Sequence, residues 1–190
     1  YDVCCSYGDH PGQSWSTGYT SYDGITSHYE RIKQLNPAIT GHASNDAVTG
    51  AKMVQAPNQA SQAMATMMAQ DRKPYVSISS IPNIYQLWQV LHTNSLARWA
   101  WANFHICQSM LAATNTETQR QQVVAREGAF NQVLADVCAQ YSRCRWDNKA
   151  VYNYSFSASQ VSTLDFFHHS LSGQAALSRV TWTASWWASS

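Results

Sequence analysis

The residues best suited to chemistry lie near the end of the chain, where the sequence reads Asp165-Phe-Phe-His168. An imidazole that takes a proton from one group and gives it to another needs a pKa near the working pH and a partner that fixes its tautomer. Asp165, on the same turn as His168, can be that partner. The two phenylalanines would partly desolvate both groups, which favours shifted pKa values. The spacing indicates an acid–base pair, although an aspartate that only caps the turn also fits it.

A serine near the other end of the chain is the candidate nucleophile. Residues 1–5 are apolar and β-prone, and Ser6 follows them directly, before a Gly8-Asp9 turn signal. A side chain in this position would stand at the carboxyl end of the first strand, where parallel α/β folds bind their ligands. An ordinary loop hydroxyl at Ser6 is the alternative.

Several stretches of the chain resemble the SGNH (GDSL-type) hydrolases, particularly the secreted actinobacterial lipases and esterases. The last block of that family is similar to Asp165 to His168 and to the Ser170-Leu-Ser-Gly-Gln174 that follows. The other similar stretches are residues 45–53, 79–88, 106–111 and 144–147, so that the resemblance extends over about residues 45–182. It implies a Ser–His–Asp triad in which Asp165 and His168 are the acid and the base, an acyl-enzyme intermediate, and no cofactor.

The nucleophile and oxyanion blocks depart from that family's pattern. The family has Gly-Asp-Ser-Tyr where this chain has Cys4-Cys5-Ser6-Tyr7, and cysteines lack the freedom of glycine at positive φ. The resemblance assigns the oxyanion role to the N–H groups of Ser6 and Gly50, and Asn58 is the nearest remnant of a missing Gly-x-Asn-Asp block. The segment of residues 52–75 is also shorter than the corresponding segment of the family. Two interpretations stay open: a diverged, poorly active chain, or a sequence that is imperfect at these two places.

Length, composition and charge bound the class of protein. A chain of 190 residues, 45% of them hydrophobic, is expected to form one domain over residues 1–190. Twelve basic and eleven acidic side chains leave a net charge of +1, which provides no field to hold nucleic acid. No apolar run approaches the roughly 20 residues that cross a bilayer, so we expect no integral membrane association. We expect a monomer that acts on a small-molecule or lipid ester.

The cysteines and histidines give two further predictions. Cys138 and Cys144 are spaced to close a small loop, and we interpret them as a disulfide of an exported protein. Two buried thiols in a cytosolic protein are the alternative. The histidines are scattered without an HExxH motif or paired-cysteine spacing, so no metal site is expected. The chain has no Walker or Rossmann glycine pattern, which argues against a nucleotide cofactor.

The elements that must position these residues follow an alternating order. We expect strands at residues 1–5, 75–79 and 150–156, and helices at residues 58–71, at 83–101 with a break near Thr93-Asn94, from a Thr114–Glu117 capping box to Val137, and from Ser170 to Val180. In the third helix, Val123, Val124, Phe130, Val133, Leu134 and Val137 form an apolar stripe. This order predicts a flavodoxin-like three-layer α/β/α sandwich with a mostly parallel central sheet.

Together these features predict a secreted serine ester hydrolase of lipase, esterase or phospholipase type that acts through Ser6, His168 and Asp165. The rival hypothesis is a catalytically impaired relative with the same fold. Such a protein would bind a carbohydrate or an acyl group in the inherited cleft, and the departures at the nucleophile and oxyanion blocks favour it.

Overall fold

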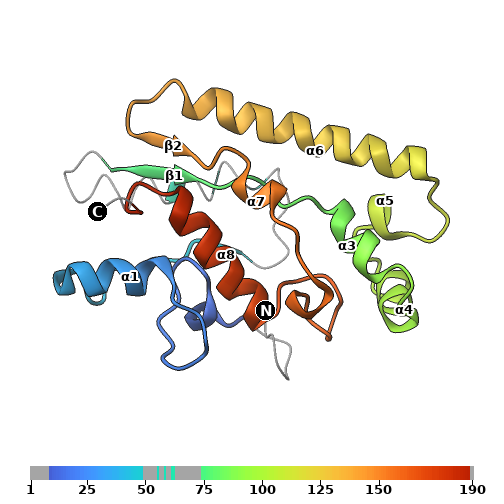
Figure 1. Ribbon diagram of the computed structural model, residues 1–190, viewed down its shortest axis with the longest axis horizontal. Helices are drawn as coiled ribbons and strands as arrows, with labels where there is room; N and C mark the ends of the chain where they lie inside the picture. The colour runs from blue at the N-terminus through green and yellow to red at the C-terminus, as the bar shows by residue number, and fades with distance from the viewer. Residues whose placement is uncertain (1–8, 49–54, 56–57, 59–60, 63–73, 189–190) are drawn as a thin grey trace.

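The computed structural model describes residues 9–48, 55, 58, 61–62 and 74–188, and it has a mixed α/β fold that is mostly helical (Figure 1). The strands are β1 (Val76–Ile78) and β2 (Cys144–Trp146). The α-helices are α1 (His28–Leu35), α3 (Tyr85–Leu91), α4 (Ser95–Asn103), α5 (Gln108–Leu111), α6 (Glu117–Cys138), α7 (Ala150–Asn153) and α8 (Leu171–Ala184). Short 3-10 helices lie at Pro11–Gln13, Pro37–Ile39 and Ala158–Gln160.

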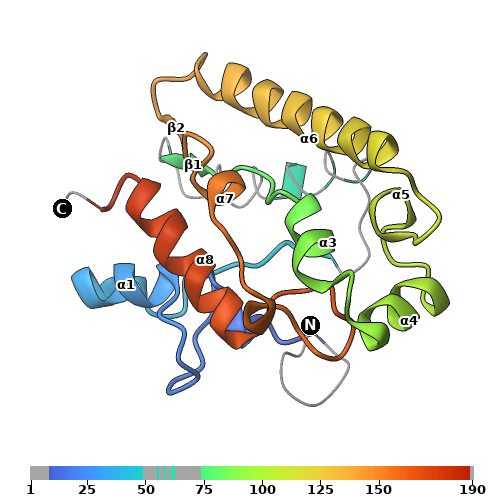
Figure 2. The same ribbon diagram turned by 45° about the vertical axis from the view of Figure 1, so that its right-hand side comes forward.

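The two strands pair in parallel, with Val76 opposite Cys144 and Ile78 opposite Trp146. Helices α3 to α6 lie between them in the sequence and form the long crossover that parallel pairing requires. Figures 1 and 2 show α6 on one side of the pair and α8 on the other. The strand expected at residues 75–79 is confirmed. The described residues show only this pair, so a three-layer sandwich with a central sheet is not shown.

Residues 150–156, expected to be a strand, instead begin with helix α7, so that prediction is wrong. Asp147 follows β2, and its carboxylate accepts the backbone N–H groups of Lys149 at 2.9 Å and Val151 at 3.1 Å. Ser80 follows β1, donates to the same carboxylate at 2.7 Å and accepts the N–H of Tyr152 at 2.9 Å. These bonds satisfy the first amides of α7, and they outweigh the β propensity of the local sequence.

The helical segment expected at residues 83–101, as one or two helices, is confirmed as the two helices α3 and α4, and the chain breaks between them as predicted. The side chain of Asn94 caps α4 by accepting the N–H groups of Leu96 at 2.9 Å and Ala97 at 3.2 Å. Both helices contribute to one apolar cluster of buried side chains, which consists of Leu87, Leu91, Ala97, Trp101, Met110, Leu111 and Val161. This cluster fixes α4 and α5 relative to the loop before α8.

Helix α6 is confirmed, but it begins two residues later than predicted. The capping box is formed by Thr116 and Gln119, whose side chain accepts the Thr116 N–H at 2.7 Å. Glu117, the predicted partner of Thr114, instead accepts the hydroxyl of Tyr85 at 2.6 Å. The pairs Thr114–Glu117 and Thr116–Gln119 both have the spacing of a capping box. Only the path of the preceding chain selects between them.

The buried face of α6 is polar, so the predicted apolar stripe is wrong for its C-terminal half. Phe130, Val133 and Val137 are between 42% and 58% exposed, whereas the helix buries Glu127 and Asn131. Asn131 accepts the N–H of Ile81 at 2.8 Å and donates to its carbonyl at 3.2 Å, and Glu127 accepts the N–H of Ile84 at 3.3 Å. The loop after β1 needs partners for these backbone groups, and α6 provides them.

Glu127 should make folding stability fall as the pH rises from about 4.5 to 7. Burial raises the pKa of Glu127 to about 7, above the unfolded value of about 4.3, so the folded state binds more protons across that interval. Glu127→Gln keeps an acceptor for the Ile84 N–H but cannot ionise. We expect this variant to be more stable than the parent by about 1 to 2 kcal/mol at pH 8 and to lose this pH dependence.

Urea denaturation at several pH values checks this prediction. Asp136→Asn is the matched control, because Asp136 is exposed on the same helix. It should keep the parental pH dependence. Parallel pH curves for Glu127→Gln and the parent would contradict the prediction.

The disulfide between Cys138 and Cys144 is confirmed, and it joins the end of α6 to the start of β2. Cys107 is the free cysteine among the described residues. No helix in the described part of the chain combines the length and apolar character needed to cross a membrane.

The segment of residues 9–48 packs against α8 and brings further side chains to one end of the molecule. Helix α1, which lies within this segment, was not predicted. The His28 Nε2 lies 2.9 Å from the Thr181 hydroxyl of α8, and the N–H of Trp15 donates to the Gln174 side chain at 3.2 Å. Burial lowers the pKa of His28 to about 4, so its neutral ring serves as a packing element. Helix α8 begins after Ser170, as predicted, and the Ser170 hydroxyl caps it.

Candidate active site

The loop before α8 carries the predicted acid–base pair and is held at its base and at its tip. Val161 and His169 form an antiparallel bridge at the base. Phe166, at the tip, has a φ of 55°, a left-handed conformation that is rare for a bulky residue. The indole Nε1 of Trp101 donates to the Phe166 carbonyl at 2.9 Å, which ties the tip to α4. Trp101 therefore positions the loop, a role that its sequence context alone does not reveal.

Asp165 is buried and serves both as a cap and as a partner for His168. Its Oδ1 accepts the N–H groups of Phe167 at 2.9 Å and His168 at 3.1 Å, and its Oδ2 lies 2.5 Å from His168 Nδ1. Burial raises the pKa of Asp165, but the hydrogen bonds from the His168 ring and the Phe167 N–H outweigh it and hold the pKa below its ordinary value. The carboxylate is therefore ionised at neutral pH, and His168 Nδ1 must be the donor.

The two adjacent histidines have different environments. His169 is the more buried of the two, and its ring packs against Phe156 with centroids 4.8 Å apart. Burial, together with the charge of His168, lowers the pKa of His169 to about 4, which keeps it neutral. The His168 side chain is 39% exposed, and with Nδ1 donating to Asp165 its Nε2 holds the lone pair of the neutral ring. His168 is thus the histidine in position to act as a base.

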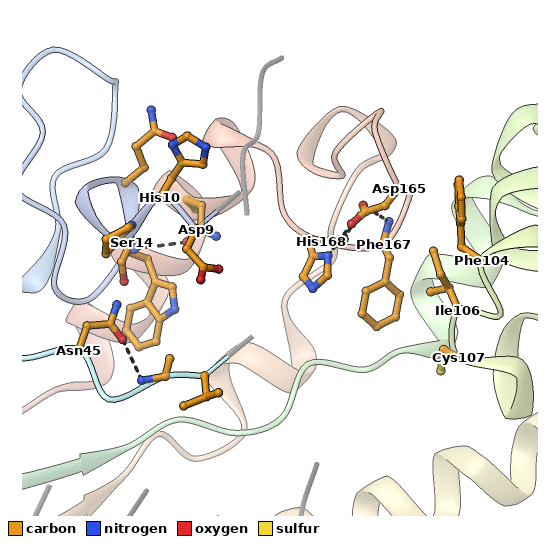
Figure 3. A pocket seen from close by; sticks show the side chains of 16 residues that line it. Asp9, His10, Ser14, Asn45, Phe104, Ile106, Cys107, Asp165, Phe167 and His168 are labelled. Carbon is orange, nitrogen blue, oxygen red and sulfur yellow. Dashed lines mark hydrogen bonds and ion pairs between the residues drawn. The ribbon is translucent and has the colours of Figure 1, made fainter. Parts of the chain in front are cut away.

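His168 lies on the wall of an open cavity of about 1010 Å³, and Figure 3 shows its imidazole between two groups of side chains. Phe104, Ile106 and Cys107 stand on one side, and Asp9, His10, Ser14 and Asn45 stand on the other. The cavity is lined by Asp9, His10, Pro11, Gln13, Ser14, Trp15, Asn45, Ala47, Val48, Phe104, Ile106, Cys107, Asp165, Phe167, His168 and Gln174. A base between an apolar and a polar wall suits a substrate with one apolar and one polar part.

The apolar wall comes from the tight turn between α4 and α5. His105 and Cys107 have φ values of 52° and 41° there, and the Gln108 side chain holds the turn by donating to the carbonyls of Trp101 at 2.7 Å and Ile106 at 3.1 Å. Burial raises the pKa of the Cys107 thiol, so it is protonated at neutral pH and contributes apolar surface.

The polar wall comes mainly from residues 9–48, and it contains an unused acceptor. Oε1 of Gln13 is buried and has no hydrogen-bond partner among the described residues. Ser14 is the serine that lines the cavity in the described part of the chain. Its Oγ accepts the N–H groups of Ser16 at 3.3 Å and Thr17 at 3.4 Å, which is a turn-stabilising role.

The structure brings together only part of the predicted site. Asp165 and His168 are paired as predicted, whereas Ser6 and Gly50 lie outside the described residues. Asn58 is exposed and is not among the described residues that line the cavity. No group of three or more His, Cys, Asp or Glu side chains in the described ranges is placed to hold a metal ion.

Sequence reasoning missed Gln13, because nothing in residues 9–44 marks it as a neighbour of His168, whereas Asn45 belongs to the stretch of residues 45–53 that resembles the family.

Comparisons of the chain with models of known protein families, with curated proteins and with solved structures found no match. The resemblance to the SGNH hydrolases therefore rests on the sequence motifs alone.

Proposed function

We propose that this protein is a serine ester hydrolase of lipase, esterase or phospholipase type, with Ser6, His168 and Asp165 as its triad. The observation that supports the proposal best is the 2.5 Å contact between His168 Nδ1 and a buried, ionised Asp165 on the wall of a large cavity. This pair has the tautomer and orientation that a general base needs. The apolar wall would take the acyl part of the ester, and the polar wall would take the alcohol part.

In the proposed reaction, His168 Nε2 removes the hydroxyl proton of Ser6 as Oγ forms a bond to the ester carbonyl carbon. The N–H groups of Ser6 and Gly50 would stabilise the oxyanion. The tetrahedral intermediate collapses, the bond to the alcohol oxygen breaks, and that oxygen takes the proton from Nε2. Water then repeats the sequence on the acyl-enzyme and releases the acid. Asp165 stabilises the imidazolium at both stages and stays ionised.

We also propose that the protein works outside the cell. The Cys138–Cys144 disulfide supports this location, because disulfides persist mainly in oxidising compartments.

Labelling with a fluorophosphonate, followed by peptide mapping, tests the proposal. We expect covalent modification of Ser6, because only a serine activated by a base reacts with this probe. Ser6→Ala should abolish the labelling. Ser14→Ala is the matched control, since Ser14 lines the same cavity but its hydroxyl is engaged in a turn, and this variant should label like the parent.

Labelling that disappears in Ser14→Ala and persists in Ser6→Ala would overturn the assignment of the nucleophile. A folded parent protein that does not label at all would favour the rival function, a non-catalytic protein that binds a carbohydrate or acyl ligand in this cavity.

A further inference from the structure

Helix α4 carries a group of exposed apolar side chains beside the cavity. Leu96 is 64% exposed, Trp99 58% and Phe104, just after the helix, 54%. Leu96 and Trp99 are three residues apart and are therefore neighbours on the helix surface. The rings of Trp99 and Phe104 contact each other edge to face, with centroids 5.7 Å apart. We call these three side chains the α4 face.

The α4 face is not the side of the helix that packs on the core. The opposite side of α4 is already buried, because Ala97, Ala100 and Trp101 are each at most 1% exposed. Figures 1 and 2 both show α4 at the outer edge of the molecule. Contiguous exposed apolar side chains of this kind mark a contact with a partner or a lipid surface.

The α4 face continues into the cavity. Phe104 belongs both to the face and to the cavity wall, where it is followed by Ile106 and Phe167 (Figure 3). An apolar chain could therefore move from a surface that covers the α4 face to a position near His168 along a continuous apolar path. This continuity favours a lipid surface as the occupant, because a folded protein on the face would block the path.

The charge around the α4 face also fits a lipid surface. Residues 83–116 contain no aspartate and no glutamate, and Arg98 is the one arginine among them, without any lysine. Arg98 is exposed and adjoins Trp99, and the exposed His92 and His105 lie before and after α4. A segment without carboxylates does not repel anionic phosphates, and Arg98 can attract them. Aromatic side chains such as Trp99 favour the boundary between lipid and water.

We propose that the α4 face docks the protein on a lipid surface and presents the mouth of the cavity to it. The lipid bilayer, or an aggregate of its lipids, then delivers the ester directly to the apolar wall. This inference rests on the proposed function for the identity of the substrate, but the docking itself does not depend on catalysis.

Sedimentation with vesicles of equal parts phosphatidylcholine and phosphatidylglycerol tests the docking. The full chain with His168→Ala is used, so that no lipid is hydrolysed, and we expect it to sediment with the vesicles. Adding Trp99→Ala or Leu96→Ser should weaken this partitioning about tenfold each, because an exposed side chain that enters the interface is lost. Phe130→Ala is the matched control, because Phe130 is an exposed aromatic residue on α6, and it should bind like the unsubstituted chain.

Three results would overturn the docking proposal: no binding to these vesicles, full binding by both the Trp99→Ala and the Leu96→Ser variant, or an equal loss with Phe130→Ala. A dimer seen by sedimentation velocity and dissociated by Trp99→Ala would also overturn it, since the α4 face would then join two copies of this chain.

Hydrolysis of the water-soluble p-nitrophenyl acetate separates this inference from the proposed function. With His168 intact, Trp99→Ala should keep the parental rate on this substrate and lose activity only on vesicle lipid. A parent that binds vesicles but does not hydrolyse p-nitrophenyl acetate would contradict the proposed function and leave the docking standing.

Discussion

His168→Ala is expected to lower kcat for a p-nitrophenyl ester by about 10,000-fold, because the variant has no group to take the nucleophile's proton or to return it to the alcohol. Asp165→Asn should cause a loss of similar size for a different reason. An asparagine can still accept the N–H groups of Phe167 and His168 through its Oδ1. Its amide would donate to His168 Nδ1, which places the ring proton on Nε2 and removes the base.

His169→Gln is the control for these two variants. His169 adjoins His168 and is half-buried, but it packs against Phe156 and is not among the residues that line the cavity. It should keep a rate within a few-fold of the parent. All three variants are compared after their folding has been confirmed by urea denaturation. A near-parental rate for His168→Ala would remove His168 from the mechanism, and one for Asp165→Asn would limit Asp165 to a capping role.

The parts of the fold that short-range spacing encodes could be predicted from the sequence. The Asp165–His168 pair spans one turn, the disulfide joins two cysteines six positions apart, and the Ser170 cap depends on the next three residues. In each case the interacting groups are so near in sequence that the chain between them has few other conformations.

The predictions that were wrong or missing concern residues whose partners lie far away in the sequence. Residues 150–153 are helical because Asp147 and Ser80, 67 residues apart, together satisfy the amides at the start of α7. Helix α6 buries Asn131 because Ile81, 50 residues earlier, needs its hydrogen bonds. The polar wall of the cavity likewise depends on contacts of residues 9–48 with α8. The periodic pattern of residue types along a helix or strand does not show which of these distant residues come into contact.

Arg120 is a buried charged residue that the sequence analysis did not single out, and it underlies the second large effect. It lies in the first turns of α6 and is only 4% exposed. Its guanidinium donates to the carbonyls of Met110 at 3.1 Å, Ala112 at 2.9 Å and Asn115 at 2.7 Å, and it stacks 3.6 Å from the centroid of the Trp88 ring. Arginine alone supplies planar donors for three carbonyls together with a cation for the ring.

Arg120→Met should therefore destabilise the fold by about 3 kcal/mol, because methionine fills the volume but leaves the three carbonyls without their donor. Arg120→Lys keeps the charge but cannot reach all three carbonyls, and we expect about half of that loss. Urea denaturation followed by tryptophan fluorescence measures both. Arg126→Met, an exposed position on the same helix, is the control and should stay within about 0.5 kcal/mol of the parent.

The same contact links stability to the site. Met110 and Ala112 belong to α5 and its C-terminal end, and α5 follows directly on the turn that supplies Ile106 and Cys107 to the cavity. Loss of the Arg120 donors should loosen that turn, so KM for a long-chain p-nitrophenyl ester should rise more than KM for p-nitrophenyl acetate, which needs little of the apolar wall. An Arg120→Met variant that loses less than about 1 kcal/mol would show that water replaces the guanidinium at all three carbonyls.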